Sequence, residues 1–335
     1  MSGPKNQATQ EPAGLSRLAT VTVTFNPSQL ELEAQLQALP TSSIKIIVDN
    51  ASQPQHWTEI ETLASQFKNV HLIRNDTNLG LAAAINRGVN WLATLTTSPE
   101  LVLLLDQDSV PQPASVATLL AAFKHLQSEG HKVGCVGPLL TDPNTGLTHG
   151  FHQSSRWRWS RAYPQIDSTS PVPCSNLNGS GTLVPIELFQ QLGGLDETLF
   201  IDHVDTEWAF RVMAYGYGLW GIPGAVFNHS MGQASIRFWL FGWRVWPVRS
   251  PSRHYYLYRN ATILMRRSYI PTVWKAWAVA KLLLTTGVVA MTGPSRIQQI
   301  KGMWHGIKKG SQKAPLYRPI ASPNKSEKRQ KHKKA

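Results

Sequence analysis

The stretch Leu101-Val102-Leu103-Leu104-Leu105-Asp106-Gln107-Asp108 places two carboxylates directly after a run of five apolar residues. An uninterrupted apolar run of this length is typical of a strand buried on both faces of a parallel sheet. Ligands of such sheets bind beyond the carboxyl ends of the strands, where Asp106 and Asp108 fall. Hard cations such as Mg²⁺ prefer oxygen ligands, so the pair indicates a divalent cation that faces a diphosphate. The alternative is a solvated turn that opens the helix near Pro113.

Upstream of this stretch, an apolar strand followed by an amphipathic helix occurs three more times. Strands are predicted at 18–25, 44–48 and 70–73, and the segments after them repeat apolar residues at helical spacing. This β-α-β-α order implies an α/β fold, with a Rossmann-like mixed, mainly parallel sheet and helices on both faces. Asn26 and Asp49 close or follow strands, so we expect them at the same edge of the sheet as Asp106.

Two further segments of the first half are candidate ligand-binding loops. In Asp49-Asn50-Ala51-Ser52, the carboxylate can accept hydrogen bonds from a nucleobase or a ribose. In Asn78-Leu79-Gly80, which opens the helix 81–92, glycine and small residues allow a diphosphate to approach the helix N-terminus. Helix capping and an Asx turn explain both segments as structural features equally well.

The second half contains an acidic helix start and a lone histidine. Three acids, Asp202, Asp205 and Glu207, fall within six positions at the start of a helix predicted at 206–215. The helix dipole favours negative charge there, but three acids beside His203 are more than capping requires. A carboxylate of this group is a candidate general base. His229, in a glycine-flanked loop after the turn 222–224, is a candidate metal or diphosphate contact, although lone histidines are more often structural.

The C-terminal part differs in composition from the rest. From Arg296 onward there are twelve Lys or Arg and one Glu, so this part supplies most of the net charge of +13. Such a tail fits an anionic partner, namely phospholipid, nucleic acid or a phosphorylated carrier, or simply solubilises the chain. The apolar segment 272–292 carries Lys275 and Lys281, which favours a helix in a membrane interface over a spanning one, with a core helix as the alternative.

Four regions are therefore predicted: a leader at 1–17, a catalytic or binding domain at 18–235, a helical, Trp-rich extension at 236–310 and a basic tail at 311–335. The leader has no apolar run like that of a signal peptide. Only two cysteines are present, Cys135 and Cys174, which favours a reducing compartment.

Taken in order, the segments from about Ala19 to Gly232 resemble family 2 of the inverting glycosyltransferases, which have the glycosyltransferase A fold. The resemblance rests on Val-Asp-Asn-Ala-Ser at 48–52, Asn-Leu-Gly at 78–80, the 106/108 pair, Asn-Gly-Ser-Gly at 178–181, Gly-Gly-Leu-Asp at 193–196 and the acidic helix start. Within the family the chain is similar to bacterial rhamnosyltransferases. These carry Asp-Gln-Asp-Ser, as at 106–109, Phe-Ile-Asp-x-Val-Asp-x-Glu-Trp, as at 200–208, and Tyr-x-x-Tyr-Arg-Asn, as at 255–260.

The resemblance implies transfer of rhamnose from dTDP-rhamnose to a saccharide or lipid-linked acceptor in cell-surface polysaccharide synthesis, with Mg²⁺ or Mn²⁺. It implies a cytoplasmic location at the inner face of the plasma membrane, peripheral membrane contact and no nucleic acid. Asp205 falls on the catalytic aspartate, although the family more often has Glu-Asp where this chain has Val204-Asp205. The implied donor-binding residues are Thr24, Asn26, Asp49, Asn78, Gly80, Asn86, Asp106 and Gln107. The implied metal ligands are Asp108 and His229, and the implied acceptor or supporting residues are Gly181, Asp202, Glu207 and Arg211.

Two other functions fit parts of the sequence. A metal-dependent nucleotidyltransferase also combines an α/β sheet with paired carboxylates, but it needs basic residues after the first strand. The loop Asn26-Pro27-Ser28 has none. A non-enzymatic binder of anionic polymers would use only the basic tail.

Overall fold

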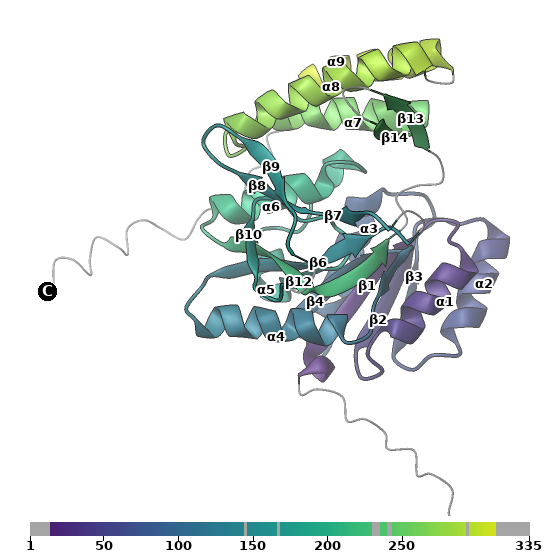
Figure 1. The fold of residues 1–335 in the computed structure, drawn as a ribbon. Helices are drawn as coiled ribbons and strands as arrows, with labels where there is room; N and C mark the ends of the chain where they lie inside the picture. Colours follow the sequence, from purple (N-terminus) through teal and green to yellow (C-terminus); the bar gives the residue numbers. More distant parts are fainter. Residues whose placement is uncertain are drawn as a thin grey trace, which may run out of the picture.

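The computed structural model describes residues 14–143, 146–165, 168–229, 235–239, 243–292 and 295–312 (Figure 1). Most of the predicted leader and tail, at 1–13 and 313–335, lies outside the described residues. A central sheet has the strand order β10-β12-β6-β11-β4-β1-β2-β3. Helices cover both of its faces, and the C-terminal helices form a further layer above the sheet in Figure 1.

The N-terminal half of this sheet is parallel, as predicted. It contains β1 (Leu18–Thr24), β2 (Ile44–Asp49), β3 (Val70–Arg74) and β4 (Leu101–Asp106), which pair side by side in parallel register. In the second half, β6 (Val133–Thr141) and β12 (Gly218–His229) are also parallel, whereas β11 (Thr182–Pro185) runs antiparallel between β4 and β6. The edge strand β10 (Val172–Cys174) is antiparallel to β12. The α/β fold class with a mixed sheet is therefore confirmed.

Strand β4 shows why this sheet is covered on both faces. Val102 and Leu104 pack into the cluster that contains α3 (Leu81–Leu92) and α6 (Val204–Ala214), while Leu103 and Leu105 pack into the cluster of α4 (Ser115–Ser128). Successive side chains of a strand point to opposite faces, so an all-apolar strand needs two apolar layers. Helices α1 (Gln29–Ala38) and α2 (Pro54–Ala64) pack with Ile47 of β2, and α5 (Ile186–Gln191) joins the α3 and α6 layer.

Several short elements were not predicted from the sequence. They are η1 (Leu15–Arg17), β5 (Ser109–Pro111), β7 (Thr148–His149), β8 (Phe151–Ser154), β9 (Trp159–Ala162) and η2 (Glu197–Leu199). The expected turn at 222–224 is instead part of β12, which continues through it with a shift in register between Ile222 and Val226. A bulge of this kind accommodates Pro223, which has no N–H for a regular ladder.

The C-terminal extension begins with a hairpin before it becomes helical. Strands β13 (Ser235–Trp239) and β14 (Trp243–Pro247) pair antiparallel, where the sequence predicted helix from 236 onward. Aromatic and β-branched residues, which dominate this stretch, favour strands. Helices α7 (Pro251–Met265), α8 (Thr272–Thr292) and α9 (Arg296–Ser311) then follow.

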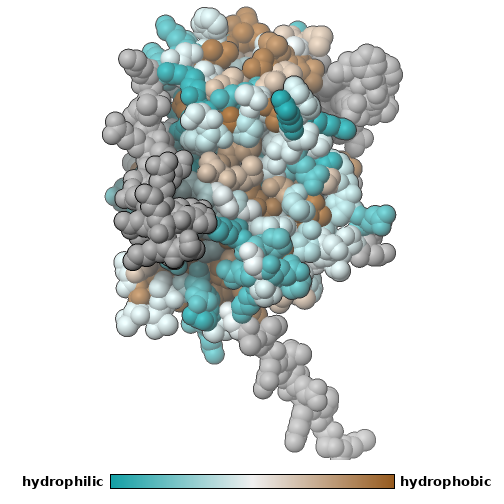
Figure 2. Space-filling model, turned by 90° about the vertical axis from the view of Figure 1, so that its left-hand side faces the viewer, coloured by the Kyte–Doolittle hydropathy of each residue, from teal (hydrophilic) through white to brown (hydrophobic). Residues whose placement is uncertain are grey.

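By length and composition, residues Thr272–Met291 of α8 form a helix that could cross a membrane. One face of α8 is buried against the rest of the protein, because Trp274, Ala278 and Thr285 are each at most 3% exposed. Its other face is open, with Leu283 and Met291 each 69% exposed. Figure 2 shows hydrophobic residues gathered at the upper end of the molecule, the end that α8 and α9 form in Figure 1.

Candidate functional site

The acidic turn after β4 lies beside His229 because of strand pairing. The chain turns at Gln107 and Asp108 and returns as β5, which pairs with the end of β12 so that Ser109 lies opposite His229. The Nδ1 atom of His229 is 3.2 Å from Oδ1 of Asp108 and 3.3 Å from Oγ of Ser109. Ligand atoms of Asp106, Asp108 and His229 all lie within 4.8 Å of one another. This set of two carboxylates and an imidazole fits a divalent cation.

The charges of this cluster perturb one another. Burial raises the pKa of Asp106, and the neighbouring Asp108 carboxylate adds to this, while His229 and the hydroxyl of Ser180 oppose it. Burial opposes the charge of His229, but the hydrogen bond and negative charge of Asp108, with Asp106, outweigh it and raise the His229 pKa. Two acids held together in a partly buried turn repel each other, so positive charge from a cation would relieve a real electrostatic cost.

Asp205 is part of the same electrostatic site. It lies in the first turn of α6, where its Oδ1 accepts a hydrogen bond of 2.8 Å from the backbone N–H of Thr206. Burial raises the pKa of Asp205 to about 6, against the hydrogen bond from Thr206, and the negative charges of Asp106 and Asp202 add to the increase. A carboxylate with a pKa near neutrality is suited to take a proton at physiological pH.

Two small cavities, each about 30 Å³, adjoin the segment 177–180 near these acids. Asp205 lines the first, together with apolar side chains of α3, α6 and β4 such as Ile85, Leu104 and Trp208. Ser180, the partner of Asp106, lines the second together with His149 and Arg161. The apolar surroundings of Asp205 explain why burial is the largest cause of its raised pKa.

The loop that precedes Asp205 has an unusual backbone. Phe200, Asp202 and His203 all have positive φ, at 65°, 61° and 63°, a region that non-glycine residues rarely occupy. Helix α7 holds this loop through Asn260, whose Nδ2 lies 2.7–2.8 Å from the carbonyl oxygens of Leu199, Ile201 and Asp202. The strained conformation is therefore stabilised by a helix outside the main domain.

The Asp202 side chain ties the same loop to α7. Arg253 donates two hydrogen bonds to its carboxylate, of 3.0 and 2.9 Å, and Arg249 donates a third of 3.0 Å. Burial alone would raise the pKa of Asp202, but the hydrogen bonds and charges of Arg253 and Arg249 lower it. Asp202 is thus held as a carboxylate by two arginines, which makes it a supporting residue of the loop.

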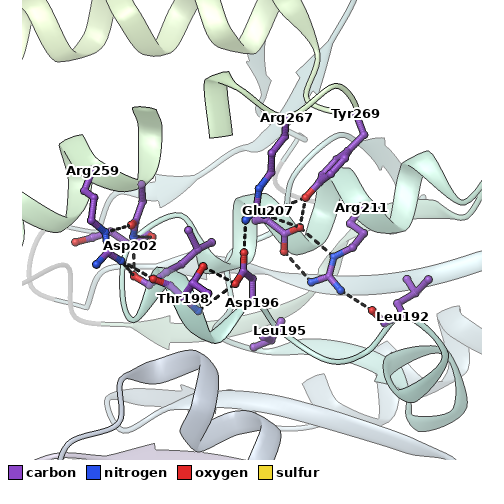
Figure 3. A network of polar contacts seen from close by, with 12 residues as sticks. Leu192, Leu195, Asp196, Thr198, Asp202, Glu207, Arg211, Arg259, Arg267 and Tyr269 are labelled. Carbon is purple, nitrogen blue, oxygen red and sulfur yellow. Dashed lines mark hydrogen bonds and ion pairs between the residues drawn. The ribbon is translucent and has the colours of Figure 1, made fainter. Parts of the chain in front are cut away.

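Glu207 has a different environment from Asp205, although only one residue separates them. Its buried carboxylate accepts hydrogen bonds of 3.0 and 2.7 Å from Arg211 and lies 3.1 Å from Arg267. Tyr269 donates a further hydrogen bond to it, and Arg267 also pairs with Asp196 (Figure 3). Arg211 in turn donates to the carbonyl of Leu192. Glu207 and Arg211 therefore belong to a buried polar network behind the site.

The residues predicted at the end of β2 form hydrogen bonds with one another and with neighbouring residues. Asp49 is fully buried and accepts hydrogen bonds from the hydroxyls of Thr24 and Ser52 and from the N–H of Ser52, the last at 2.9 Å. The backbone N–H of Asn26 donates a hydrogen bond to the hydroxyl of Ser52. The side-chain oxygen of Asn26 accepts a hydrogen bond from the backbone N–H of Gln53. These contacts form an Asx-type turn that shapes the edge of the sheet.

The remaining predicted residues divide between the sheet edge and the core. Asn78 accepts hydrogen bonds from Asn50 and from the N–H of Gly80. Gly80 has φ 86°, and a Cβ there would collide with Phe200. The side-chain oxygen of Gln107 accepts a hydrogen bond from the backbone N–H of Phe25. Gly181, which has φ 78°, donates a backbone hydrogen bond to the carbonyl of Leu104. Asn86 lies apart from these, since it is buried and joins α3 to Leu195 and Glu197.

Comparison with known proteins agrees with this geometry. Residues 44–193 match the family described as Glycosyl transferase family 2. The chain is 29% identical, over 287 residues, to the dTDP-rhamnosyl transferase RfbF of Shigella flexneri, an alignment that covers 85% of this chain and 92% of the relative. The chain therefore carries a family 2 glycosyltransferase domain, and its relatives include rhamnosyltransferases. This glycosyltransferase is also 26% identical, over 250 residues, to the N-acetylglucosaminyl-diphospho-decaprenol L-rhamnosyltransferase of Mycobacterium tuberculosis, covering 66% of this chain and 78% of that protein.

Solved structures show that the glycosyltransferase shares its fold with distant enzymes. GalNAc-T7 with UDP, GalNAc and Mn²⁺ superimposes with a TM-score of 0.56 at 17% identity, over 89% of this chain and 57% of that one. The glycosyltransferase thus spans little more than half the length of GalNAc-T7. The mannosyltransferase PcManGT of Pyrobaculum calidifontis, in complex with GDP-Man and Mn²⁺, gives a TM-score of 0.51 at 16% identity, over 89% and 88% of the two chains.

Some residues of the glycosyltransferase site were not singled out from the sequence. The hydroxyl of Ser180 donates a hydrogen bond to Asp106, and Ser180 belongs to the motif Asn-Gly-Ser-Gly at 178–181, which could have indicated it from the sequence. Arg249 and Arg253 bind Asp202 from 47 and 51 residues away, and no sequence spacing indicates this. Asn260 belongs to the Tyr-x-x-Tyr-Arg-Asn motif, but only the fold shows that it contacts the loop before Asp205.

Proposed function

We propose that this glycosyltransferase moves rhamnose from dTDP-rhamnose to a saccharide or lipid-linked acceptor in cell-surface polysaccharide synthesis, with inversion at the anomeric carbon. The observation that carries the mechanism is the Asp205 carboxylate, with its pKa of about 6, in the same electrostatic site as the acidic turn at 106–108. The names of the two relatives, both rhamnosyltransferases, support the donor. The second name, which includes N-acetylglucosaminyl-diphospho-decaprenol, also supports a lipid-linked acceptor.

The chain's own side chains fit a divalent cation, Mg²⁺ or Mn²⁺. Asp106, Asp108 and His229 would hold it, because their ligand atoms already lie within 4.8 Å of one another. The sequence assigned Asp106 to the donor base or ribose, and its place in this cluster supports a role beside the metal instead. When bound, the cation would stabilise negative charge on the departing diphosphate. The titles of both superimposable structures name Mn²⁺, which supports the same cofactor class here.

In the proposed reaction, Asp205 accepts the proton of the acceptor hydroxyl while the hydroxyl oxygen bonds to the anomeric carbon. The bond to the nucleoside diphosphate breaks on the opposite face, so one displacement inverts the anomeric centre. The loop 200–203 orients Asp205, and Arg253, Arg249 and Asn260 hold that loop. Apolar side chains beside Asp205 exclude water, which disfavours hydrolysis of the donor.

We further propose that the donor lies along the sheet edge formed by Thr24, Asn26, Asp49, Asn78, Gly80 and Gln107. Asp49 contributes mainly by shaping this edge, since its carboxylate already accepts hydrogen bonds from Thr24 and Ser52. Asn86 would act by fixing the 193–197 segment. The proposed location is cytoplasmic, at the inner face of the plasma membrane with peripheral contact, and no nucleic-acid partner is proposed.

A donor screen tests this proposal. The purified protein would be incubated with Mg²⁺ or Mn²⁺, a panel of nucleotide sugars and short saccharide or polyprenyl-diphosphate acceptors, and products would be identified by mass spectrometry. We expect transfer from dTDP-rhamnose, and NMR of the product should show inverted anomeric configuration. A preference for another sugar would overturn the donor, a retained configuration would overturn the mechanism, and no transfer from any donor would overturn the function.

A further inference from the structure

Helix α9 presents two different apolar faces. Its first face carries Gly302, Gly306 and Gly310 and packs on the backbone of α7, so closely that an added Cβ would collide with backbone oxygens of Pro251, Tyr255 and Arg259. Small residues at a four-residue spacing permit this close approach of two helices. This face fixes the position and the rotation of α9 on the protein.

The second face of α9 carries large apolar side chains that are exposed. Ile297 is 72% exposed, Ile300 40%, Trp304 64% and Ile307 36%. At 3.6 residues per turn these four positions form one stripe roughly 80° wide, on the side of the helix away from the glycines. Helix α8 adds Val279, Leu283, Leu284 and Met291, which are 43–69% exposed. Large exposed apolar patches of this kind mark interaction sites.

Basic residues border this exposed face. On the helix wheel of α9, Lys301 and Lys308 lie next to the apolar stripe on one side and Arg296 on the other. Helix α9 carries four Lys or Arg and no acid, and residues 313–335 contain eight more with one Glu. A stripe of isoleucines and a tryptophan between basic residues has the composition of a helix that lies in a membrane interface.

We propose that the exposed face of α9, together with the neighbouring open face of α8, docks onto a bilayer that contains anionic phospholipids. Trp304 and the isoleucines would enter the headgroup region, and the flanking lysines would lie near lipid phosphates. The arrangement favours a helix pair on the surface over a spanning α8. The opposite face of α8 is buried in the protein, and Lys275 of α8 donates a hydrogen bond of 2.8 Å to the carbonyl of Arg267.

Docking in this orientation would bring the bilayer close to the catalytic loop. Helix α7 lies between α9 and that loop: it packs on the glycine face of α9, and its Arg253 and Asn260 bind the loop residue Asp202. Two stacked helices, α9 and α7, each roughly 10 Å across, would then separate the membrane surface from the loop, so a lipid-linked acceptor would need to extend roughly 20 Å. This consequence rests on the proposed function, whereas the docking itself does not.

Vesicle co-sedimentation of the full chain tests the docking without donor or acceptor. Vesicles of phosphatidylcholine with about one third phosphatidylglycerol would be compared with pure phosphatidylcholine vesicles, since anionic lipid attracts basic segments. The test variant is Ile297→Ser/Trp304→Ser, which changes only exposed side chains and leaves the basic tail intact. The matched control is Leu30→Ser, which changes a side chain of α1 that is 79% exposed.

We expect wild type and the Leu30→Ser control to bind anionic vesicles, and the double variant to bind at least tenfold more weakly. The charge variant Lys301→Glu/Lys308→Glu should also bind more weakly, and about 0.5 M salt should weaken wild-type binding because it screens surface charge. Wild-type affinity in the double variant would overturn the proposal, because the tail alone would then suffice. A wild-type dimer that becomes monomeric in the double variant, with no vesicle binding by either, would also overturn it and assign the face to a second copy of the chain.

Discussion

Asp205 and Glu207 lie in the same turn of α6, yet they face opposite regions of the molecule. Glu207 points into a buried network in which Arg211, Arg267 and Tyr269 all contact its carboxylate. Asp205 faces the site, where its described electrostatic neighbours are the carboxylates of Asp106 and Asp202, and its pKa rises to about 6. Glu207 is thus paired with two arginines, whereas Asp205 lies near other negative charges and is costly to keep ionised.

This difference distinguishes a structural acid from the acid that we propose as the general base. The Glu207 carboxylate holds Arg211, Arg267 and Tyr269 together in the buried network, so it contributes to folding. A carboxylate that is costly to keep charged is a better proton acceptor, but it lowers the stability of the fold. The contrast therefore makes opposite predictions for activity and stability at two neighbouring acids.

The largest expected effect is on turnover in Asp205→Asn. Removal of a general base should lower kcat by about 10²–10⁴-fold, while donor binding is kept. Turnover would be measured as nucleoside diphosphate release, and donor binding as a shift of the melting temperature. The control is Glu129→Gln, an exposed acid at the end of α4, which should retain full activity. Wild-type turnover in Asp205→Asn would remove Asp205 from the mechanism.

The next largest effect is on stability in Glu207→Ala. Arg211 would lose the carboxylate of Glu207 while Arg267 would keep Asp196, and breaking a buried ion pair by removing one member costs about 3–5 kcal/mol. Urea denaturation would measure the change. Glu207→Gln, which keeps the hydrogen-bonding oxygen, should lose less. A Glu207→Ala protein that is as stable as wild type but inactive would show that Glu207 acts in the reaction rather than in the fold.

A smaller effect is expected where α7 meets the loop before Asp205. Asn260→Ala removes a donor from three loop carbonyls, of which that of Leu199 keeps Arg259, and this should cost about 1–3 kcal/mol and free the positive-φ loop. We expect kcat to fall by about tenfold with little change in KM for the donor, because the Asp205 carboxylate would be oriented less precisely. Ser252→Ala, an exposed change on the same helix, is the control. An equal loss of stability with unchanged kcat would limit Asn260 to a structural role.

The smallest effect is the stability cost of Asp205 itself. Its pKa rises from 3.8 in the unfolded chain to about 6 in the folded one, so folding disfavours the charged form. The cost is absent below pH 3.8, where both states are protonated, and grows to its full value above about pH 6. Without metal or nucleotide, Asp205→Asn should therefore be more stable than wild type by ~1–3 kcal/mol at pH 7.5, and equally stable near pH 4. Equal stability at both pH values would show that the raised pKa is not present in solution.

Local sequence patterns predicted the sheet and one half of the site. Uninterrupted apolar runs and helical spacing suffice to locate β1, β2, β3 and β4, because burial on two faces demands such runs. The acidic turn follows from its place after β4, since strand ends are where such sheets bind ligands. The helical, Trp-rich C-terminal extension was predicted correctly, but its first residues, at 235–247, form a hairpin instead of a helix.

The amino-acid sequence by itself determined the α/β fold, the carboxylates at 106 and 108 and the acidic start of α6. Only the tertiary structure decided which acid of α6 is paired and which faces the site, because that depends on Arg267, 60 residues further along the chain. It also decided that β5 and β12 bring His229 to Asp108, and that Asn260 holds the loop 58 residues upstream. These contacts join distant segments through packing and hydrogen bonds, and no local periodicity encodes them.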